Sequence, residues 1–193
     1  MSKPAPVRHH RFTVQDYFRM GEVGILNEDD RVELLEGEIV ELSPIGNVHA
    51  SVVSRLTALF VPAAATHAIV RVQDPAILSR FSAPQPDIAV VAFRQDFYVD
   101  AHPGPDDTLL IVEVADSSVR IDLGFKARLY ASARVPEYWV VDISRQRIVA
   151  HTQPEDQGYG SVRTLSPGEE LSTPALPGGS WPVNEILGRT SPV

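Results

Sequence analysis

Three almost uninterrupted apolar runs limit what this chain can fold into. They are IAVVAF at 88–93, TLLIVEV at 108–114 and YWVVDI at 138–143. A strand with one face in water alternates apolar and polar residues, whereas these runs are apolar on both faces, as expected for strands buried on both sides. The sequence therefore predicts a central sheet covered by helices, which places the chain in the α/β or α+β class.

The chain ahead of these runs predicts a helix, a hairpin and a second helix. Thr13 and Asp16 have the spacing of a capping box, which marks the start of a short helix. The turn residues Glu36-Gly37 separate two hairpin strands, whose acids we expect to line a solvated face. Asn47 is expected to cap the second helix. The expected elements are the helix 13–20, the strands 31–35 and 38–42, and the helix 47–65.

The remaining segments predict further strands around one more helix. Asp74-Pro75 interrupts a strand, because Pro cannot donate to a ladder. A helix opens near Ser118, and Pro136 lies beyond its end. The expected elements are the interrupted strand 67–78, the helix 118–133 and the strands 146–151 and 161–165. We expect a single domain at 12–187, a flexible arm at 1–11 and a flexible tail at 188–193.

Composition excludes several classes of function. The chain has 193 residues and no cysteine, which excludes disulfides and thiolate metal sites and is consistent with the cytoplasm. No apolar run approaches the ~18 residues needed to span a bilayer, so we expect no membrane partner. The net charge of −8 argues against a protein that binds nucleic acid through a broad basic surface.

Two acids beside the apolar runs are candidates for chemistry. Asp87 follows Pro86 at the start of one run, where an acid is either a turn residue or a ligand. Glu113 lies inside another, where it is either buried with a partner or directed to solvent from an edge strand. If the two strands are neighbours, the paired carboxylates attract a cation. Oxygen ligands favour Mg²⁺, with Mn²⁺ as an alternative, and the six histidines form no zinc motif.

The helix that follows Glu113 presents three polar side chains at steps of four residues. Asp122, Lys126 and Tyr130 therefore share one helix face. They form either an ordinary surface Asp–Lys pair or an inner face that brings the ammonium to the carboxylates. In the second case, Lys126 can orient a water molecule and stabilise charge on a phosphate.

Four motifs follow one another along the chain: ELLEGEIVELSP at 33–44, PDIAVV at 86–91, IVEVADSSVRIDLGFKARLY at 111–130 and VPEYWVVD at 135–142. In this order they resemble the Uma-type family of restriction endonuclease-like proteins, which is assigned to the PD-(D/E)XK nuclease superfamily. The resemblance covers roughly residues 12 to 187. It implies a restriction-endonuclease-like fold, with a mixed central β-sheet flanked by helices, an N-terminal β-hairpin and extra C-terminal strands.

The resemblance also implies roles for individual residues. Asp87 and Glu113 match the metal-binding acids, whereas the usual lysine position holds Ala115, and the lysine of this family is displaced to Lys126. Glu33 matches a further acid, as a third metal-side carboxylate or a water orienter. The positions with supporting roles are His49, Ser117, Asp122 and Tyr130.

The resemblance implies an endonuclease that hydrolyses DNA phosphodiester bonds with Mg²⁺ held by Asp87 and Glu113. We expect DNA and a second copy of the chain, in a homodimer, as partners. The arginines form either a local basic stripe or a scattered solvated surface. The alternative function is a catalytically inactive binding or assembly module that keeps the nuclease scaffold. The arginines in question are Arg71, Arg80, Arg94, Arg120, Arg128 and Arg134.

Overall fold

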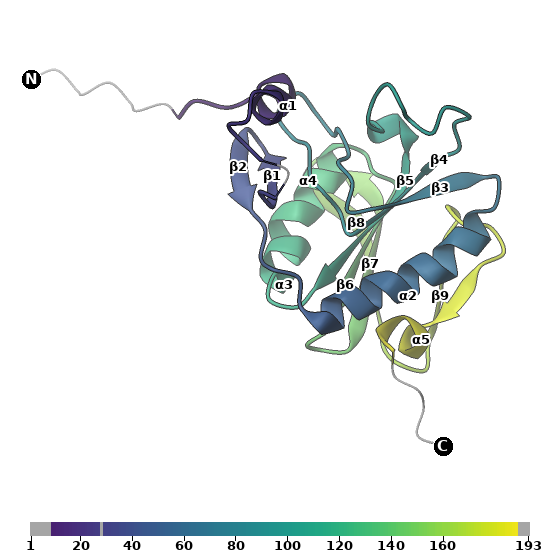
Figure 1. Cartoon of the computed structure of the whole chain (residues 1–193). Helices are drawn as coiled ribbons and strands as arrows, with labels where there is room; N and C mark the ends of the chain where they lie inside the picture. Colours follow the sequence, from purple (N-terminus) through teal and green to yellow (C-terminus); the bar gives the residue numbers. More distant parts are fainter. Residues whose placement is uncertain (1–8, 28, 189–193) are drawn as a thin grey trace, which may run out of the picture.

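A six-stranded sheet forms the centre of the computed structural model, which describes residues 9–27 and 29–188 (Figure 1). The strand order is β3-β4-β5-β6-β7-β8, and only β5 and β6 are parallel. The predicted mixed sheet is therefore confirmed, and the three apolar runs form three of its inner strands, β4, β5 and β6. The strands are β3 Ala68–Val72, β4 Ile88–Ala92, β5 Thr108–Ala115, β6 Glu137–Asp142, β7 Arg147–Glu155 and β8 Gly158–Leu165.

One face of the sheet is covered by the long helix α2, Asn47–Ala64, and by the C-terminal segment (Figure 1). Leu56 and Phe60 of α2 and Trp181 of the C-terminal segment pack together on this face. Ile186 and Leu187 are also buried, so the C-terminal segment is part of the core. The C-terminal elements are β9 Glu170–Ser172, β10 Ser180–Pro182 and α5 Val183–Leu187.

The opposite face carries the helical segment after β5. It consists of α3 Val119–Ile121, a π-turn at Asp122–Lys126 labelled η2, and α4 Ala127–Ser132. Alternation along β5 assigns its side chains to the two faces, because successive residues point to opposite sides of a strand. Val112 packs in the α2 cluster and Ile111 in the α4 cluster. Glu113, two residues from Ile111, therefore points toward the α4 side.

The N-terminal hairpin packs against this second face. It comprises β1 Val32–Leu35 and β2 Glu38–Glu41, as predicted, and is preceded by α1 Val14–Glu22 with the predicted capping box. Leu34 exchanges backbone hydrogen bonds with Ala83 and so fixes the hairpin to the loop before β4. The expected solvated acids are exposed at positions 36, 38 and 41, whereas Glu33 is buried.

Two sequence expectations are wrong. Ala76–Leu78 is not part of a strand, because its N–H groups bond to three separate loop carbonyls instead of one ladder partner, with only an isolated bridge at Ser79–Ser82 nearby. Asn47 does not cap α2, because it is already the first helical residue, and Gly46 occupies the N-cap without a side-chain bond.

The two predicted flexible ends fall largely outside the described residues, which omit 1–8 and 189–193. Arg11 belongs to the described part of the predicted N-terminal arm. It donates from Nε to the carbonyl of Glu36 at 2.7 Å, and its guanidinium lies over the Phe81 ring. A 3-10 turn, η1 Pro105–Asp107, precedes β5. Within residues 9–27 and 29–188, no helix has both the length and the apolar character needed to cross a bilayer.

Candidate active site

The strand register aligns three polar side chains across β3, β4 and β5. Ile88 is the residue of β4 that pairs with the last residue of β3 on one side and with β5 on the other. One step before it, Asp87 stands between Gln73, which follows β3, and Glu113 of β5. The N–H of Gln73 continues the ladder by donating to the Asp87 carbonyl at 3.2 Å. The two predicted acids are therefore neighbours on adjacent strands.

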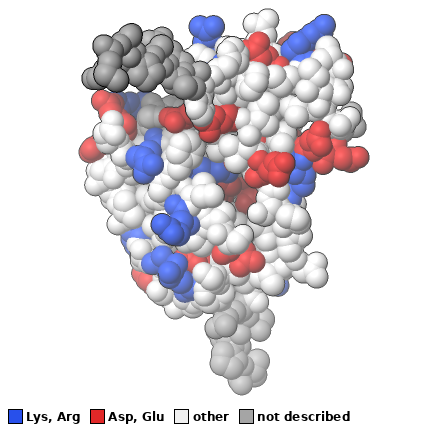
Figure 2. Space-filling model, turned by 90° about the vertical axis from the view of Figure 1, so that its left-hand side faces the viewer, with Lys and Arg blue, Asp and Glu red and all other residues white. Residues whose placement is uncertain are grey.

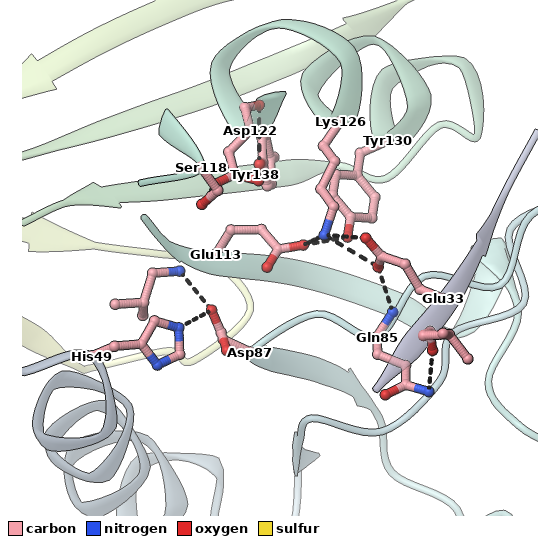
Figure 3. Close-up of polar contacts among 12 residues, drawn as sticks. Glu33, His49, Gln85, Asp87, Glu113, Ser118, Asp122, Lys126, Tyr130 and Tyr138 are labelled. Atoms are coloured by element: carbon pink, nitrogen blue, oxygen red, sulfur yellow. Dashed lines mark hydrogen bonds and ion pairs between the residues drawn. The ribbon is translucent and has the colours of Figure 1, made fainter. Parts of the chain in front are cut away.

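Asp87 is held by three partners, and Figure 3 shows its contact with His49. His49 Nε2 lies 3.0 Å from its Oδ2, and the Val114 N–H donates to the same oxygen at 2.9 Å. Gln73 donates from Nε2 to Oδ1 at 3.1 Å. Burial opposes ionisation of Asp87, but the hydrogen bonds and the charge of His49 outweigh it and lower the pKa of this carboxyl. Asp87 is consequently an anion held in one orientation, and the turn interpretation is wrong.

Glu113 shares an ammonium ion with Glu33 (Figure 3). Lys126 Nζ lies 2.9 Å from Glu113 Oε1 and 3.0 Å from Glu33 Oε1. Tyr130 donates its hydroxyl proton to Glu113 Oε1 at 2.7 Å. The Gln85 N–H donates to Glu33 Oε2 at 3.1 Å. β5 lies inside the sheet, so the edge-strand alternative for Glu113 is wrong.

The π-turn positions the side chains of the helical segment. Lys126 ends this turn, and Tyr130 follows one helical turn later, so both reach Glu113. Asp122 is also buried, but its Oδ2 accepts from Ser118 Oγ at 2.5 Å, and its carbonyl accepts from the Tyr138 hydroxyl at 3.1 Å. The inner-face interpretation is correct for Lys126 and Tyr130, while Asp122 has a different partner. None of the three forms the alternative surface pair.

Negative charge exceeds positive charge in this cluster. Burial, together with the carboxylates of Asp122, Asp87 and Glu33, raises the pKa of Glu113 to about 8, although the Lys126 ammonium acts in the opposite direction. Burial would lower the pKa of Lys126, but the charges of Glu113 and Glu33 raise it well above its usual value. Burial also raises the pKa of Asp122. Lys126 is therefore a permanent cation in a site that still carries an excess of acid.

These side chains line a pocket of about 200 Å³ between the hairpin, the N-terminus of α2 and the segment after β5. Figure 2 shows this side of the molecule, where acidic and basic side chains intermingle around a hollow in which both are visible. All eight predicted site residues line the pocket or contact a residue that does. Those lining it are Glu33, His49, Asp87, Glu113, Ser117, Asp122 and Lys126, and Tyr130 reaches it through Glu113.

The arginines named from the sequence divide into two groups. Arg71, Arg94 and Arg134 form ion pairs with Asp74, Asp96 and Asp156, respectively. The other three, which are Arg80, Arg120 and Arg128, are exposed. A continuous six-residue stripe is therefore not formed, because half of its members are neutralised locally.

Sequence reasoning missed Gln73 and Gln85, which contact the predicted acids. Gln85 contacts Glu33 through its backbone, and its side chain donates to the Val32 carbonyl at 3.1 Å. Gln73 reaches Asp87 only because the two segments are paired in register. A lone glutamine near Asp74-Pro75 carries no motif, so only the strand pairing could have identified it.

The fold is similar to that of a solved nuclease-like protein. The structure titled "Crystal structure of a putative nuclease belonging to DUF820 from Anabaena variabilis" superposes with a TM-score of 0.71 at 12% identity, covering 92% of this chain and 98% of that one. At this identity the similarity establishes the fold. The chain therefore has a nuclease-like mixed α/β fold, as the sequence predicted.

Sequence comparison identifies the family. Residues 14–184 match the Uma2 family, which is described as "Putative restriction endonuclease". This match covers most of the chain, so the protein belongs to that family. No curated protein matches the chain.

Proposed function

We propose that this protein is a Mg²⁺-dependent endonuclease that hydrolyses phosphodiester bonds in DNA. The observation that carries the proposal is the convergence of Asp87, Glu113 and Lys126 on one pocket, from two neighbouring strands and the following helix. Paired carboxylates beside an ammonium ion suit a reaction in which charge develops on a phosphate group. The DNA substrate is supported by the family to which the chain belongs.

The unused lone pairs of the two acids fit a small divalent cation. Each carboxylate oxygen accepts two hydrogen bonds in its plane. Among the described residues, Glu113 Oε1 already accepts from Lys126 and Tyr130, and Asp87 Oδ2 from His49 and Val114. Glu113 Oε2 and one position on Asp87 Oδ1 stay open. Mg²⁺ is commonly bound by one or two carboxylates, with water and substrate phosphate completing an octahedron.

Within residues 9–27 and 29–188, no three His, Asp or Glu side chains are grouped to form a ready-made metal cage. A two-carboxylate site does not need such a cage, because Mg²⁺ retains several waters rather than requiring an all-protein set of ligands. Burial and the neighbouring acids, which together raise the pKa of Glu113 to about 8, provide the electrostatic reason for a cation there. Bound Mg²⁺ would supply a Lewis acid and lower the pKa of a coordinated water.

Lys126 contributes a fixed donor at the same position. A lysine ammonium has three N–H donors, and Glu113 and Glu33 engage two of them. The third can donate to a water molecule or to a phosphate oxygen that enters the pocket. Glu33 acts here on Lys126, which supports a positioning role more than that of a third metal ligand.

The choice of lysine at this position is itself informative. The chain has 17 Lys and Arg residues, of which only Lys3 and Lys126 are lysines. Lysine presents a compact point charge with rotatable donors, whereas the planar guanidinium of arginine needs more room. A compact point charge suits a position where one cation lies between two carboxylates, 2.9 Å from Glu113 and 3.0 Å from Glu33.

One observation favours the alternative, a catalytically inactive binding or assembly module. Lys126, Glu113 and Glu33 already form an ion-pair network that needs no ligand to hold it together. In such a module these residues would contribute only to stability. The homodimer and the cytoplasmic location are predictions from the sequence that apply equally to both functions.

A cleavage assay separates the two functions. Supercoiled and single-stranded DNA would be incubated with the wild-type protein over a titration of Mg²⁺ and of Mn²⁺, and then with Asp87→Asn, Glu113→Gln and Lys126→Arg. We expect metal-dependent cleavage by the wild type and a loss of at least about 100-fold in each variant, the order of effect of a catalytic group. Wild-type protein that cleaves neither DNA with either metal would support the inactive module instead.

A further inference from the structure

We propose that Gln73 is a positioning residue that limits Asp87 to a single coordinating position and so favours a small octahedral cation over Ca²⁺. This inference rests on the proposed function, because it concerns the same carboxylate. Gln73 lies on the pocket wall and carries none of the predicted roles. Its assignment comes from its attachment to Asp87, from the lone pairs of that acid and from its own backbone conformation.

Gln73 is attached to Asp87 at two points. Its backbone N–H donates to the Asp87 carbonyl at 3.2 Å, and its side-chain Nε2 donates to Oδ1 at 3.1 Å. The first bond continues the β3–β4 ladder and fixes the separation of the two backbones. The second bond holds Oδ1, while the bonds from His49 and Val114 hold Oδ2. Together these bonds fix the rotation of the carboxylate.

This arrangement leaves Asp87 with one open acceptor position. Both lone pairs of Oδ2 are used by His49 and Val114, and one of the two on Oδ1 is used by Gln73. Asp87 can therefore bind a cation through Oδ1 alone. Mg²⁺ requires near-ideal octahedral geometry with short bonds, whereas Ca²⁺ accepts six to eight ligands and bidentate carboxylates. Loss of the Gln73 amide would return rotational freedom to the Asp87 carboxylate. This freedom should weaken the binding of Mg²⁺ more than the binding of Ca²⁺.

The backbone of Gln73 is held in an unfavourable conformation to make this contact. Its φ is 55°, in the left-handed region where residues other than glycine are uncommon. Such strain persists where the surrounding structure determines it, and it is concentrated at functional sites. Glycine would adopt this φ without strain but would lack the amide. A glutamine at this position is thus explained by its side chain and not by the turn.

A second glutamine provides a matched control. Gln153, within β7, has a φ of 61° and an exposed side chain outside the pocket. Gln73→Gly and Gln153→Gly therefore relieve the same kind of backbone strain, and only the first removes an amide from Asp87. Gln73→Asn is a second test variant, because asparagine tolerates this φ while its side chain is too short to keep the bond.

The test measures metal binding by the full chain without DNA. Free Mn²⁺ would be quantified by its electron paramagnetic resonance signal, and Mg²⁺ and Ca²⁺ would be added as competitors. We expect Gln73→Gly and Gln73→Asn to bind Mn²⁺ and Mg²⁺ about 10-fold more weakly than the wild type, the order of effect of an outer hydrogen-bond partner, while Ca²⁺ affinity changes by less than about twofold. Gln153→Gly should bind all three ions as the wild type does.

Three results have different meanings. A lowered Mg²⁺-to-Ca²⁺ affinity ratio in both Gln73 variants, with thermal unfolding midpoints at or near that of the wild type, supports the positioning role. An unchanged ratio in either folded variant overturns it and leaves the proposed function intact. A wild-type protein that binds no Mn²⁺ overturns the proposed metal site, and the inference about Gln73 with it.

Discussion

Replacing Lys126 with methionine would leave two buried carboxylates without their cation. Nζ lies 2.9 Å from Glu113 Oε1 and 3.0 Å from Glu33 Oε1, and the Lys126, Glu113 and Glu33 side chains are only 7%, 6% and 2% exposed. Methionine preserves most of the side-chain volume, so the change is mainly one of charge. Removing one partner of a buried ion pair costs about 3–5 kcal/mol because the remaining charge is uncompensated. We expect Lys126→Met to lower the free energy of unfolding by about this amount at mildly alkaline pH.

The size of this loss should depend on pH with a definite sign. Burial and nearby acids already raise the pKa of Glu113 to about 8 in the folded protein, compared with 4.5 as its ordinary value. Removing the ammonium raises it further. Both folded proteins bind this proton more tightly than the unfolded chain, so the free energy of unfolding of both increases as the pH falls, but the variant binds the proton more tightly still and gains more between its own pKa and about 8. The difference from the wild type should therefore shrink as the pH is lowered to about 8.

Urea denaturation followed by tryptophan fluorescence measures this loss, because both tryptophans of the chain, Trp139 and Trp181, are buried. The double variant Lys126→Met/Glu113→Gln removes one of the stranded charges and should recover part of the stability. A single variant that unfolds within about 1 kcal/mol of the wild type at alkaline pH would refute the reasoning, because a solvated surface pair is worth no more than this.

Three further predictions concern other contacts. Tyr130→Phe removes the 2.7 Å hydrogen bond to Glu113 and should cost about 1.5–3 kcal/mol in urea denaturation; a smaller loss would show that water replaces the hydroxyl. Thr13→Ala removes the capping box of α1 and should cost about 1 kcal/mol in the same assay without changing DNA cleavage, whereas altered cleavage would connect α1 to the site. Burial raises the pKa of Glu137 above 4.5, so the wild-type free energy of unfolding should fall as the pH rises from that value. Glu137→Gln should reduce that slope, and an unchanged slope would contradict the shift.

Much of the fold follows from local sequence signals. The Glu36-Gly37 turn adopts positive φ at both positions, which accounts for the hairpin that this dipeptide predicts. The apolar runs become inner strands because no polar side of them could face water. Thr13 and Asp16 form both bonds of the capping box. In each case the residues that decide the structure are close together in the sequence.

The site depends on contacts that local signals do not encode. Glu33 resembles the other hairpin acids, yet it is buried because the hairpin packs on the α4 side of the sheet, where Lys126 neutralises it. The π-turn at Asp122–Lys126 inserts one residue into a helical period and so separates Asp122 from its predicted face. Gln73 is recognisable only from the register of β3 and β4. The pairing of elements far apart in sequence therefore decides which candidates meet.

Anomalous diffraction from crystals grown with Mn²⁺ tests most directly whether Asp87 and Glu113 together hold a divalent cation. We predict one anomalous peak within about 2.2 Å of both Asp87 Oδ1 and Glu113 Oε2, the two oxygens with open lone pairs. The peak should disappear in Asp87→Asn crystals grown in the same way. Well-ordered wild-type crystals with no peak in this pocket, or with a peak bound elsewhere only, would contradict a metal-dependent nuclease site at these residues.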